Sequence, residues 1–201
     1  MDKASAKPPR LIYLASNNAH KAQELTAMAQ GRFDVRLAKE LDPHVQWDES
    51  GATCLENARI KAKVVKKLTD AAVLADDSGL EVHALGGAPG VYSSRYAGRE
   101  GDDSANNAKL LQELRAVPDK DRMARFVCIL YFIDEHGQES FYEGACDGSI
   151  LTAKRGHAGF GYDPLFLVQG LGKSMAELSP EEKNAVSHRR RAFDSFLKAG
   201  T

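Results

Sequence analysis

Short apolar runs and amphipathic segments follow one another along most of the chain. Runs at 11–15, 73–75 and 126–133 have the length and apolar content of buried strands. Residues 139–151 follow a turn at His136-Gly137 and are expected to pair with the run 126–133. Because strands and helical segments mix without strict alternation or an internal repeat, the pattern predicts an α/β fold with a central mixed sheet.

Helices are predicted where apolar residues recur at intervals of three and four. One spans 20–30 and ends at Gly31, and another spans 104–115. Between them a helix begins at Thr53, whose spacing to Glu56 is that of a capping box. The polar face of this helix carries four lysines that we expect to be solvated, namely Lys61, Lys63, Lys66 and Lys67.

Two further helix starts are expected near the C-terminus. Ser179 precedes Pro180 and has Glu182 three positions on, which is typical of a capped helix start. Ser187 can cap a second helix. The apolar residues of that helix that we expect to pack against the core are Phe193, Phe196 and Leu197.

The length and charge of the chain limit the classes of protein it can be. At 201 residues and 43% hydrophobic content, it suffices for one domain or for two lobes that share a core. Residues 1–10 contain Pro8-Pro9 and no apolar run, so we expect a flexible tail followed by a single domain over 11–201. The 27 Lys and Arg residues nearly balance 28 Asp and Glu residues. This balance argues against a non-specific nucleic-acid binder and a polybasic membrane binder.

The cysteines and the N-terminus indicate the compartment. Cys54, Cys128 and Cys146 follow no spacing typical of a zinc site or a disulfide framework, which favours a reducing cytosol. The first ten residues do not form a signal peptide, and no segment approaches the roughly 18 apolar residues of a membrane span. We therefore expect a soluble cytoplasmic protein.

The first of four polar clusters is Ser16-Asn17-Asn18-Ala19-His20-Lys21, on a predicted strand-to-helix turn. Such a turn aims backbone N–H groups at an anion and could hold a phosphate, with Lys21 as a point charge. A capped loop without a ligand fits the same residues, and the Walker pattern is absent.

Two acidic pairs form the second and third clusters. Asp48-Glu49 precedes Ser50-Gly51 and would ordinarily be a surface pair. Asp76-Asp77 stands with Ser78-Gly79 at the end of the run 73–75, where open α/β sheets tend to place ligands. A capping role explains one of these two carboxylates, but two in a row indicate a hard cation, which takes oxygen ligands.

The fourth cluster lies toward the C-terminus and consists of Gly159-Phe160-Gly161-Tyr162-Asp163-Pro164, Lys183, His188 and Arg189. Glycines on both sides of Phe160 let its ring lie exposed beside the backbone, as a base-stacking surface requires; a tight turn with a buried ring explains the pattern equally well. Taken together, carboxylates for Mg²⁺, cations for phosphates and an aromatic surface for a base indicate a nucleoside triphosphate site.

Five motifs of the chain resemble, in the same order, those of the inosine/xanthosine triphosphate pyrophosphatase family. They are Ser16-Asn17-Asn18-x-x-Lys21, Asp76-Asp77-Ser78-Gly79-Leu80, the glycine-rich run Gly86-Gly87-Ala88-Pro89-Gly90-Val91-Tyr92-Ser93-Ser94-Arg95-Tyr96-Ala97-Gly98, Gly159-Phe160-Gly161-Tyr162-Asp163-Pro164 and Ser187-His188-Arg189. The resemblance spans residues 11 to about 198.

This resemblance implies an elongated α/β fold with a central mixed sheet flanked by helices, two lobes with a substrate cleft between them, and a homodimer. It also implies Mg²⁺-dependent hydrolysis of dITP, ITP and XTP or dXTP to the monophosphate and pyrophosphate. Such an enzyme removes non-standard purines from the nucleotide pool before they enter DNA or RNA.

By the same resemblance, Asp77 is the proton acceptor and, with Glu49, a ligand of Mg²⁺, and Asp48 is the alternative to Glu49. The positions that match the family's substrate-binding positions are Ser16, Asn17, Asn18, Ala19, His20, Lys21, Ser78, Phe160, Gly161, Tyr162, Asp163, Lys183, His188 and Arg189. The family's first motif usually reads Thr-Gly-Asn. Since Ser16 keeps the hydroxyl and Asn17 tolerates a left-handed backbone, we expect the same turn here.

Two other functions remain open at this point. One is a Maf-like pyrophosphatase that acts on pyrimidine or modified nucleotides, against which Phe160 and the motif 187–189 argue. The other is a nucleotide sensor without catalysis. Lys21, Glu49 and Asp77 argue against a sensor, because binding alone has less need of a base beside a metal.

Overall fold

One mixed sheet runs through the computed structural model, which describes residues 8–200. Its strands have the order β2-β1-β3-β5-β6-β7, and β4 pairs with β3. β1 is parallel to β2 and β3, and every other pair is antiparallel. The predicted mixed α/β sheet is therefore confirmed. Most of the expected flexible tail, residues 1–7, lies outside the described residues, and β1 begins at Arg10.

The bounds of the elements are as follows. The strands are β1 (Arg10–Ala15), β2 (Phe33–Leu37), β3 (Ala72–Val82), β4 (Pro89–Gly90), β5 (Met123–Ile133), β6 (Glu139–Ile150) and β7 (Phe166–Val168). The helices are α1 (Ala19–Ala29), α2 (Cys54–Lys66), α3 (Asp103–Glu113), α4 (Pro180–Val186) and α5 (His188–Lys198). The short 3₁₀ helices are η1 (Ala38–Glu40), η2 (His83–Leu85), η3 (Ser93–Arg95), η4 (Asp119–Asp121) and η5 (Met175–Glu177).

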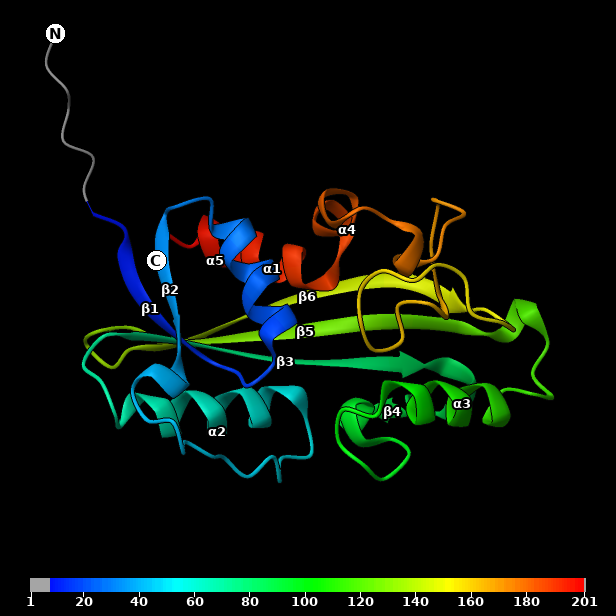
Figure 1. Cartoon of the computed structure of the whole chain (residues 1–201), viewed down its shortest axis with the longest axis horizontal. Helices are drawn as coiled ribbons and strands as arrows, with labels where there is room; N and C mark the ends of the chain where they lie inside the picture. Colours follow the sequence, from blue (N-terminus) through cyan, green and yellow to red (C-terminus); the bar gives the residue numbers. More distant parts are fainter. Residues whose placement is uncertain (1–7, 201) are drawn as a thin grey trace, which may run out of the picture.

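Helices cover both faces of the sheet near β1. Figure 1 shows α1, α4 and α5 on one side and α2 on the other. One core cluster joins α1 and α5 to the face of β3 that carries Leu74, and a second joins α2 to the face that carries Val73 and Ala75. Successive residues of β3 therefore point into different layers.

The sheet extends well beyond its two parallel partners. β1 pairs only with residues 72–75 of β3, whereas β5 pairs with β3 from Val73 to Val82. A third core cluster covers this far end, where α3 packs against the long strands (Figure 1) and β7 pairs with β6 at the edge of the sheet. The end of β1 at Ala15 therefore leaves the middle of β3 with a free edge, which the β1–α1 turn faces.

The predicted helix caps account for where three helices begin. Ser179 and Glu182 form a complete capping box before α4, and the Ser187 hydroxyl accepts a hydrogen bond from the Arg190 N–H at the start of α5. Thr53 caps α2 as expected. The other hydrogen bond of the predicted capping box differs: the Glu56 carboxylate accepts from the Ala52 N–H, not from the Thr53 N–H.

Two properties of the described residues bear on the predicted compartment. None of the helices within residues 8–200 is long and apolar enough to cross a membrane. The thiols of Cys54, Cys128 and Cys146 are all free.

Candidate active site

The β1–α1 turn has the form expected of the first motif. The Ser16 hydroxyl accepts a hydrogen bond from the Asn18 N–H, 3.1 Å. The Asn18 side chain caps α1 by accepting from the N–H groups of His20 (2.9 Å) and Lys21 (3.2 Å). Among the described non-glycine residues only Gln30 has a positive φ, so Asn17 forms the turn without a left-handed backbone.

Asp76 and Asp77 lie in the middle of β3, and the prediction that they follow the end of a strand is wrong. The strand continues to Val82 because β5 pairs with it along its whole length. Strand alternation sends the two carboxylates to opposite faces of the sheet. They therefore do not act together on one cation, as their adjacency in the sequence had indicated.

The fully buried Asp76 carboxylate is neutralised by two cations of the chain. It lies 2.6 Å from Lys21 Nζ and 2.6 Å from Arg189 Nε. Burial alone would raise the pKa of Asp76, but Arg189 and Lys21 hold it well below its ordinary value. Ser78 donates to the same carboxylate and accepts from Arg189, so this side of β3 is a closed network.

On the opposite face, Asp77 meets a buried lysine. Lys61 Nζ lies 2.5 Å from Asp77 Oδ1, 3.1 Å from Glu49 Oε1 and 2.9 Å from the carbonyl oxygen of Asp76, on the free edge of β3. Lys61 is only 3% exposed, so its predicted solvated position is wrong. Its spacing of three from Ala58 and four from Val65 places it on the apolar stripe of α2, and this was the signal in the sequence.

Lys61 and Glu49 are held in their charged forms. Burial opposes the charge of Lys61, yet Asp77 and Glu49 raise its pKa above the ordinary value. Burial likewise opposes ionisation of Glu49, whose pKa is nevertheless lowered, mainly by Lys61. The Lys61 ammonium group therefore bridges the side chains of Glu49 and Asp77.

These groups line an inner cavity of about 140 Å³ beside the β1–α1 turn. Its remaining lining includes Ser16, Asn17, Asn18, Lys21, Ser78 and Glu100. No group of three His, Cys, Asp or Glu side chains within residues 8–200 gathers closely enough to hold a metal by itself. Mg²⁺ in proteins is commonly held by one or two carboxylates together with waters and substrate phosphates. The donor set Glu49 and Asp77 therefore fits that ion.

Glu49, rather than Asp48, faces Asp77. Asp48 is exposed and lines a wider outer cavity of about 610 Å³, together with Asn17, Trp47, Arg95 and Glu100. Glu49 lines both cavities, as do Asn17, Trp47 and Glu100.

An aromatic surface lies on the other side of α1. The rings of Phe160 and His20 are stacked with centroids 5.3 Å apart and an interplanar angle of 15°. Lys183 Nζ lies 4.5 Å from the centroid of the Phe160 ring. These three side chains line a cavity of about 270 Å³, which also contacts Glu24. In this arrangement the His20 ring covers Phe160, in the stacking position that a base would need.

Glu24 was missed by the sequence reasoning, although it connects the two basic residues of the fourth cluster. Its carboxylate lies 2.9 Å from Lys183 Nζ and 2.5 Å from Arg189 Nη1. Lys183 is also bonded to Asp163, 2.7 Å away, which in turn accepts from the Phe160 N–H. Glu24 lies on the buried side of α1, one residue before Leu25, where an acid has to be paired. This position was the available signal.

Six of the predicted substrate-binding residues line neither of these cavities, namely Ala19, Gly161, Tyr162, Asp163, His188 and Arg189. The Tyr162 hydroxyl donates to the carbonyl oxygen of Ser93, and the Gly161 N–H donates to Asp103. His188 is buried and stacked on Phe126 with centroids 4.9 Å apart. Burial, helped by Arg189, holds the pKa of His188 well below its ordinary value, so its imidazole is neutral at pH 7.

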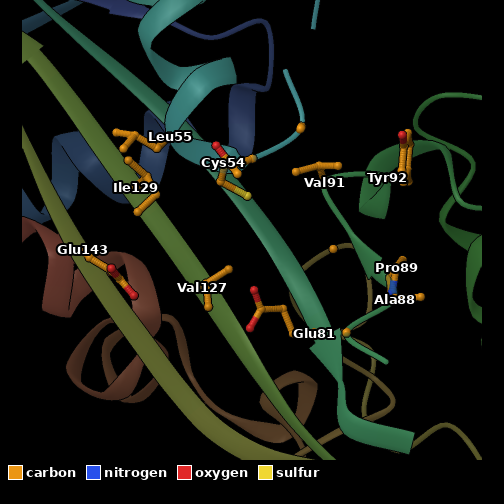
Figure 2. Close-up of a pocket in the computed structure, with 14 residues that line it drawn as sticks. Cys54, Leu55, Glu81, Ala88, Pro89, Val91, Tyr92, Val127, Ile129 and Glu143 are labelled. Atoms are coloured by element: carbon orange, nitrogen blue, oxygen red, sulfur yellow. The ribbon is translucent and has the colours of Figure 1, made fainter. Parts of the chain in front are cut away.

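A separate apolar groove of about 470 Å³ lies on the face of the sheet beyond α2. Figure 2 shows Leu55 of α2, Val127 and Ile129 of β5, and Val91 and Tyr92 of the segment after β4 around it. Tyr92 is 59% exposed at its rim. Cys54 of this groove adjoins Asp77, and Val91 lines both the groove and the inner cavity.

Comparison with known proteins places this arrangement in a family. The sequence model of the Ham1 family matches residues 12–199. The dITP/XTP pyrophosphatase of Clostridium perfringens is 45% identical over 190 residues, which cover 91% of this chain and 93% of that protein. The enzyme of the same name from Pseudomonas syringae pv. tomato is 48% identical over 185 residues, with 90% and 92% covered.

Solved structures agree with the sequence relatives. The Staphylococcus aureus Ham1 protein has a TM-score of 0.84 and 40% identity, and the match covers 96% of this chain and all of that one (100%). A nucleoside-triphosphatase described as a dITP/XTP pyrophosphatase from Mycobacterium abscessus has a TM-score of 0.76 and 43% identity, with 93% and 98% covered.

Proposed function

Because this chain belongs to the Ham1 family, we propose that it hydrolyses the non-standard purine nucleoside triphosphates dITP, ITP and XTP to the monophosphate and pyrophosphate. One structural observation carries the proposal. A pair of carboxylates, half-buried Glu49 and buried Asp77, shares an inner cavity with Lys21 and the β1–α1 turn, and an aromatic surface lies across α1. This is the set of groups that a metal-bound triphosphate with a purine base requires.

We assign the divalent-cation site to Glu49 and Asp77. Mg²⁺ bound there would neutralise charge on the phosphate oxygens as it develops. Because Lys61 Nζ contacts both carboxylates, it holds them close together. Lys61 therefore holds the side chains of Glu49 and Asp77 where both can bind a cation.

Asp77 is the group that we assign to proton transfer. Its Oδ1 is fixed by Lys61, and it lines the inner cavity beside Ser78. A water that attacks the α-phosphorus must lose a proton as the new bond forms, and an ionised carboxylate within reach accepts it. Pyrophosphate then leaves, and the monophosphate retains the oxygen from water.

Lys21 and Lys183 are the cations that we assign to the phosphates. Lys21 lines the inner cavity and Lys183 the cavity under Phe160, so they approach the substrate from two sides. Each is already oriented by a buried carboxylate, Asp76 for Lys21 and Asp163 for Lys183. Pre-oriented charges of this kind stabilise a transition state without reorganisation.

The base is assigned to the Phe160 surface, with His20 turning aside to admit it. Arg189, whose guanidinium carbon lies 6.0 Å from the Phe160 ring centroid, or His188 is the donor that we assign to the 6-keto oxygen of hypoxanthine or xanthine. Adenine has an amino group at that position and would leave a buried donor unpaired. Discrimination of that kind can reach about 10⁴-fold.

The test is release of pyrophosphate and IMP from ITP by the purified chain with Mg²⁺, measured by ion-exchange chromatography and repeated with a chelator. A panel of ATP, GTP, dTTP and modified pyrimidine triphosphates is assayed in parallel. We expect ITP, dITP and XTP to be cleaved far faster than the others, and only with Mg²⁺. Faster cleavage of pyrimidine nucleotides would favour the Maf-like function, and binding without cleavage would favour a sensor.

We further propose that the enzyme is a cytoplasmic homodimer and that residues 11–201 form a single two-lobed domain. The free thiols of Cys54, Cys128 and Cys146 support a reducing compartment. The apolar groove around Tyr92 supports self-association, because a second copy would remove it from water. Multi-angle light scattering of wild type and Val127→Glu tests this assignment: we expect a dimer and a monomer, respectively.

A further inference from the structure

Glu49 lies on a segment that cannot hold it in place alone. Residues 45–51 belong to no helix, strand or turn. From α2, the Asn57 side chain accepts from the Gly51 N–H at 2.8 Å and the Glu56 carboxylate accepts from the Ala52 N–H at 2.6 Å. These bonds fix the end of the segment, but neither reaches Glu49 itself.

Arg95 supplies the missing contact. Its Nη2 donates to the main-chain carbonyl oxygen of Glu49 at 3.1 Å, and its Nη1 donates to Glu49 Oε2 at 3.4 Å. The guanidinium carbon lies 5.3 Å from the centroid of the Tyr92 ring, so the guanidinium group packs over the face of that ring. One planar group thus holds both the backbone and the carboxylate of Glu49, as a point charge could not.

The segment that carries Arg95 is itself anchored to three elements. The Ser93 hydroxyl accepts from the Leu80 N–H of β3 at 2.9 Å. The Ser93 carbonyl oxygen accepts from Tyr162, and the Ser94 carbonyl oxygen accepts from Asn106 of α3. Arg95 therefore extends from a segment fixed by hydrogen bonds toward the segment of Glu49, which belongs to no helix or strand.

Arg95 does not line the inner cavity with Asp77. It lines only the outer cavity, and its side chain is 26% exposed. Lys61 holds Glu49 Oε1 from α2, while Arg95 holds Oε2 from the opposite side. The two cations together set the direction in which the carboxylate points.

We infer that Arg95 is a positioning residue that holds Glu49, through its backbone and its carboxylate, in the orientation that receives the divalent cation. The inference rests on the proposed function, because it takes Glu49 as a ligand of that cation. Partners of this kind, one step removed from a metal, typically change metal affinity about 10–100-fold when removed.

The sign of the effect distinguishes positioning from simple electrostatics. Removal of a positive charge near a cation site should by itself tighten cation binding. If Arg95 positions Glu49, its removal weakens binding instead. Exposed Arg99, in the same stretch of chain, is the matched control, because Arg99→Ala removes a similar charge without touching Glu49.

The experiment measures Mn²⁺ binding to the nucleotide-free protein by electron paramagnetic resonance, for wild type, Arg95→Ala, Arg95→Lys and Arg99→Ala. We expect the Kd for Mn²⁺ to rise about tenfold in Arg95→Ala, to rise less in Arg95→Lys, and to stay level or fall in Arg99→Ala. Amide hydrogen exchange at residues 46–52 should speed up in Arg95→Ala alone.

Two outcomes would overturn the inference while leaving the proposed function intact. One is an unchanged or lower Kd for Mn²⁺ in folded Arg95→Ala. The other is a raised KM for ITP at saturating Mg²⁺ with normal Mn²⁺ binding, which would make Arg95 a substrate-binding residue. Wild type that binds no Mn²⁺ would overturn the metal site and this inference together, and wild type that binds Mn²⁺ but leaves ITP intact would overturn only the hydrolysis.

Discussion

At the scale of single residues, Arg189 connects elements that are distant in the sequence. It pairs with Asp76 on β3 and Glu24 on α1, and it is only 1% exposed. A surface arginine pair contributes little to stability, but a buried one costs much to break because its partners stay charged and buried. Arg189 therefore has a structural task besides any contact with the base.

Arg189→Ala should lower the free energy of unfolding by about 3–5 kcal/mol, because Asp76 and Glu24 lose a buried partner. Urea denaturation measures this change. Arg190→Ala is the control, since Arg190 pairs only with half-exposed Asp194 on the same helix, and its removal should cost at most about 0.5 kcal/mol. Equal effects of the two substitutions would show that the network of Arg189 is not stabilising.

His188 gives the protein a specific dependence of stability on pH. Its native pKa lies well below that of the unfolded chain, and the charged groups that face it are Arg189, Asp76, Lys183 and Lys21. Below about pH 6.5 the unfolded chain binds a proton that the native state does not, so stability falls as pH falls, by about 1.4 kcal/mol per unit. Above that pH neither state is protonated, and the effect vanishes.

We therefore expect His188→Phe, which keeps a ring against Phe126, to lose this pH dependence. The stability of wild type relative to the variant should fall by about 2 kcal/mol between pH 7.5 and pH 5. Urea denaturation at several pH values gives both curves. Parallel curves would mean that the native imidazole is protonated like that of the unfolded chain.

At the scale of elements, Ser187 joins the two C-terminal helices. Its N–H donates to the Lys183 carbonyl oxygen at the end of α4, and its hydroxyl caps α5. Lys183, His188 and Arg189 therefore share one junction. The position of each of these side chains therefore depends on the two hydrogen bonds that Ser187 makes.

Ser187→Ala should cost about 1 kcal/mol of stability and lower kcat/KM for ITP, because the first turn of α5 loses its cap. Exposed Ser195, on the same helix, is the control, and Ser195→Ala should change stability by less than about 0.5 kcal/mol. Thermal unfolding and steady-state kinetics provide the two measurements. A loss of stability no greater than that of the control would argue against the cap.

Elements with strong local signals were predictable from the sequence, and those set by pairing were not. Caps and apolar periodicity placed α2, α4 and α5, because these signals act within a few residues. β2 was overlooked, although Phe33, Val35 and Leu37 alternate with Asp34 and Arg36 in the pattern of a half-buried strand. The length of β3 was also missed, because pairing with β5 keeps Asp76 and Asp77 inside a strand.

The same division applies to the candidate site. Asp77, Lys21 and Phe160 stand in motifs that the sequence displays, and the structure brings them around neighbouring cavities. Lys61 and Glu24 stand outside those motifs, on the helices α2 and α1. Their places beside apolar residues of these helices indicate that each is paired, but the sequence pattern does not say which carboxylate or cation the fold places opposite them.

At the scale of the whole molecule, the interrupted edge of β3 creates the site. β1 ends at Ala15, and the turn that follows it carries Ser16 to Lys21 across the open edge. α2 brings Lys61 to one face of β3, and α5 brings Arg189 to the other. Asp76 is thereby used to hold the fold together, while Asp77 faces the cavity and remains available for chemistry.

The most direct test of this account compares wild type with Asp77→Asn on ITP and Mg²⁺, with calorimetry for nucleotide binding and product analysis for turnover. The account predicts that the variant binds ITP, since Lys21, Lys183 and Phe160 are untouched, but releases almost no pyrophosphate, since an amide accepts no proton. Turnover by Asp77→Asn at a rate near that of wild type would contradict it.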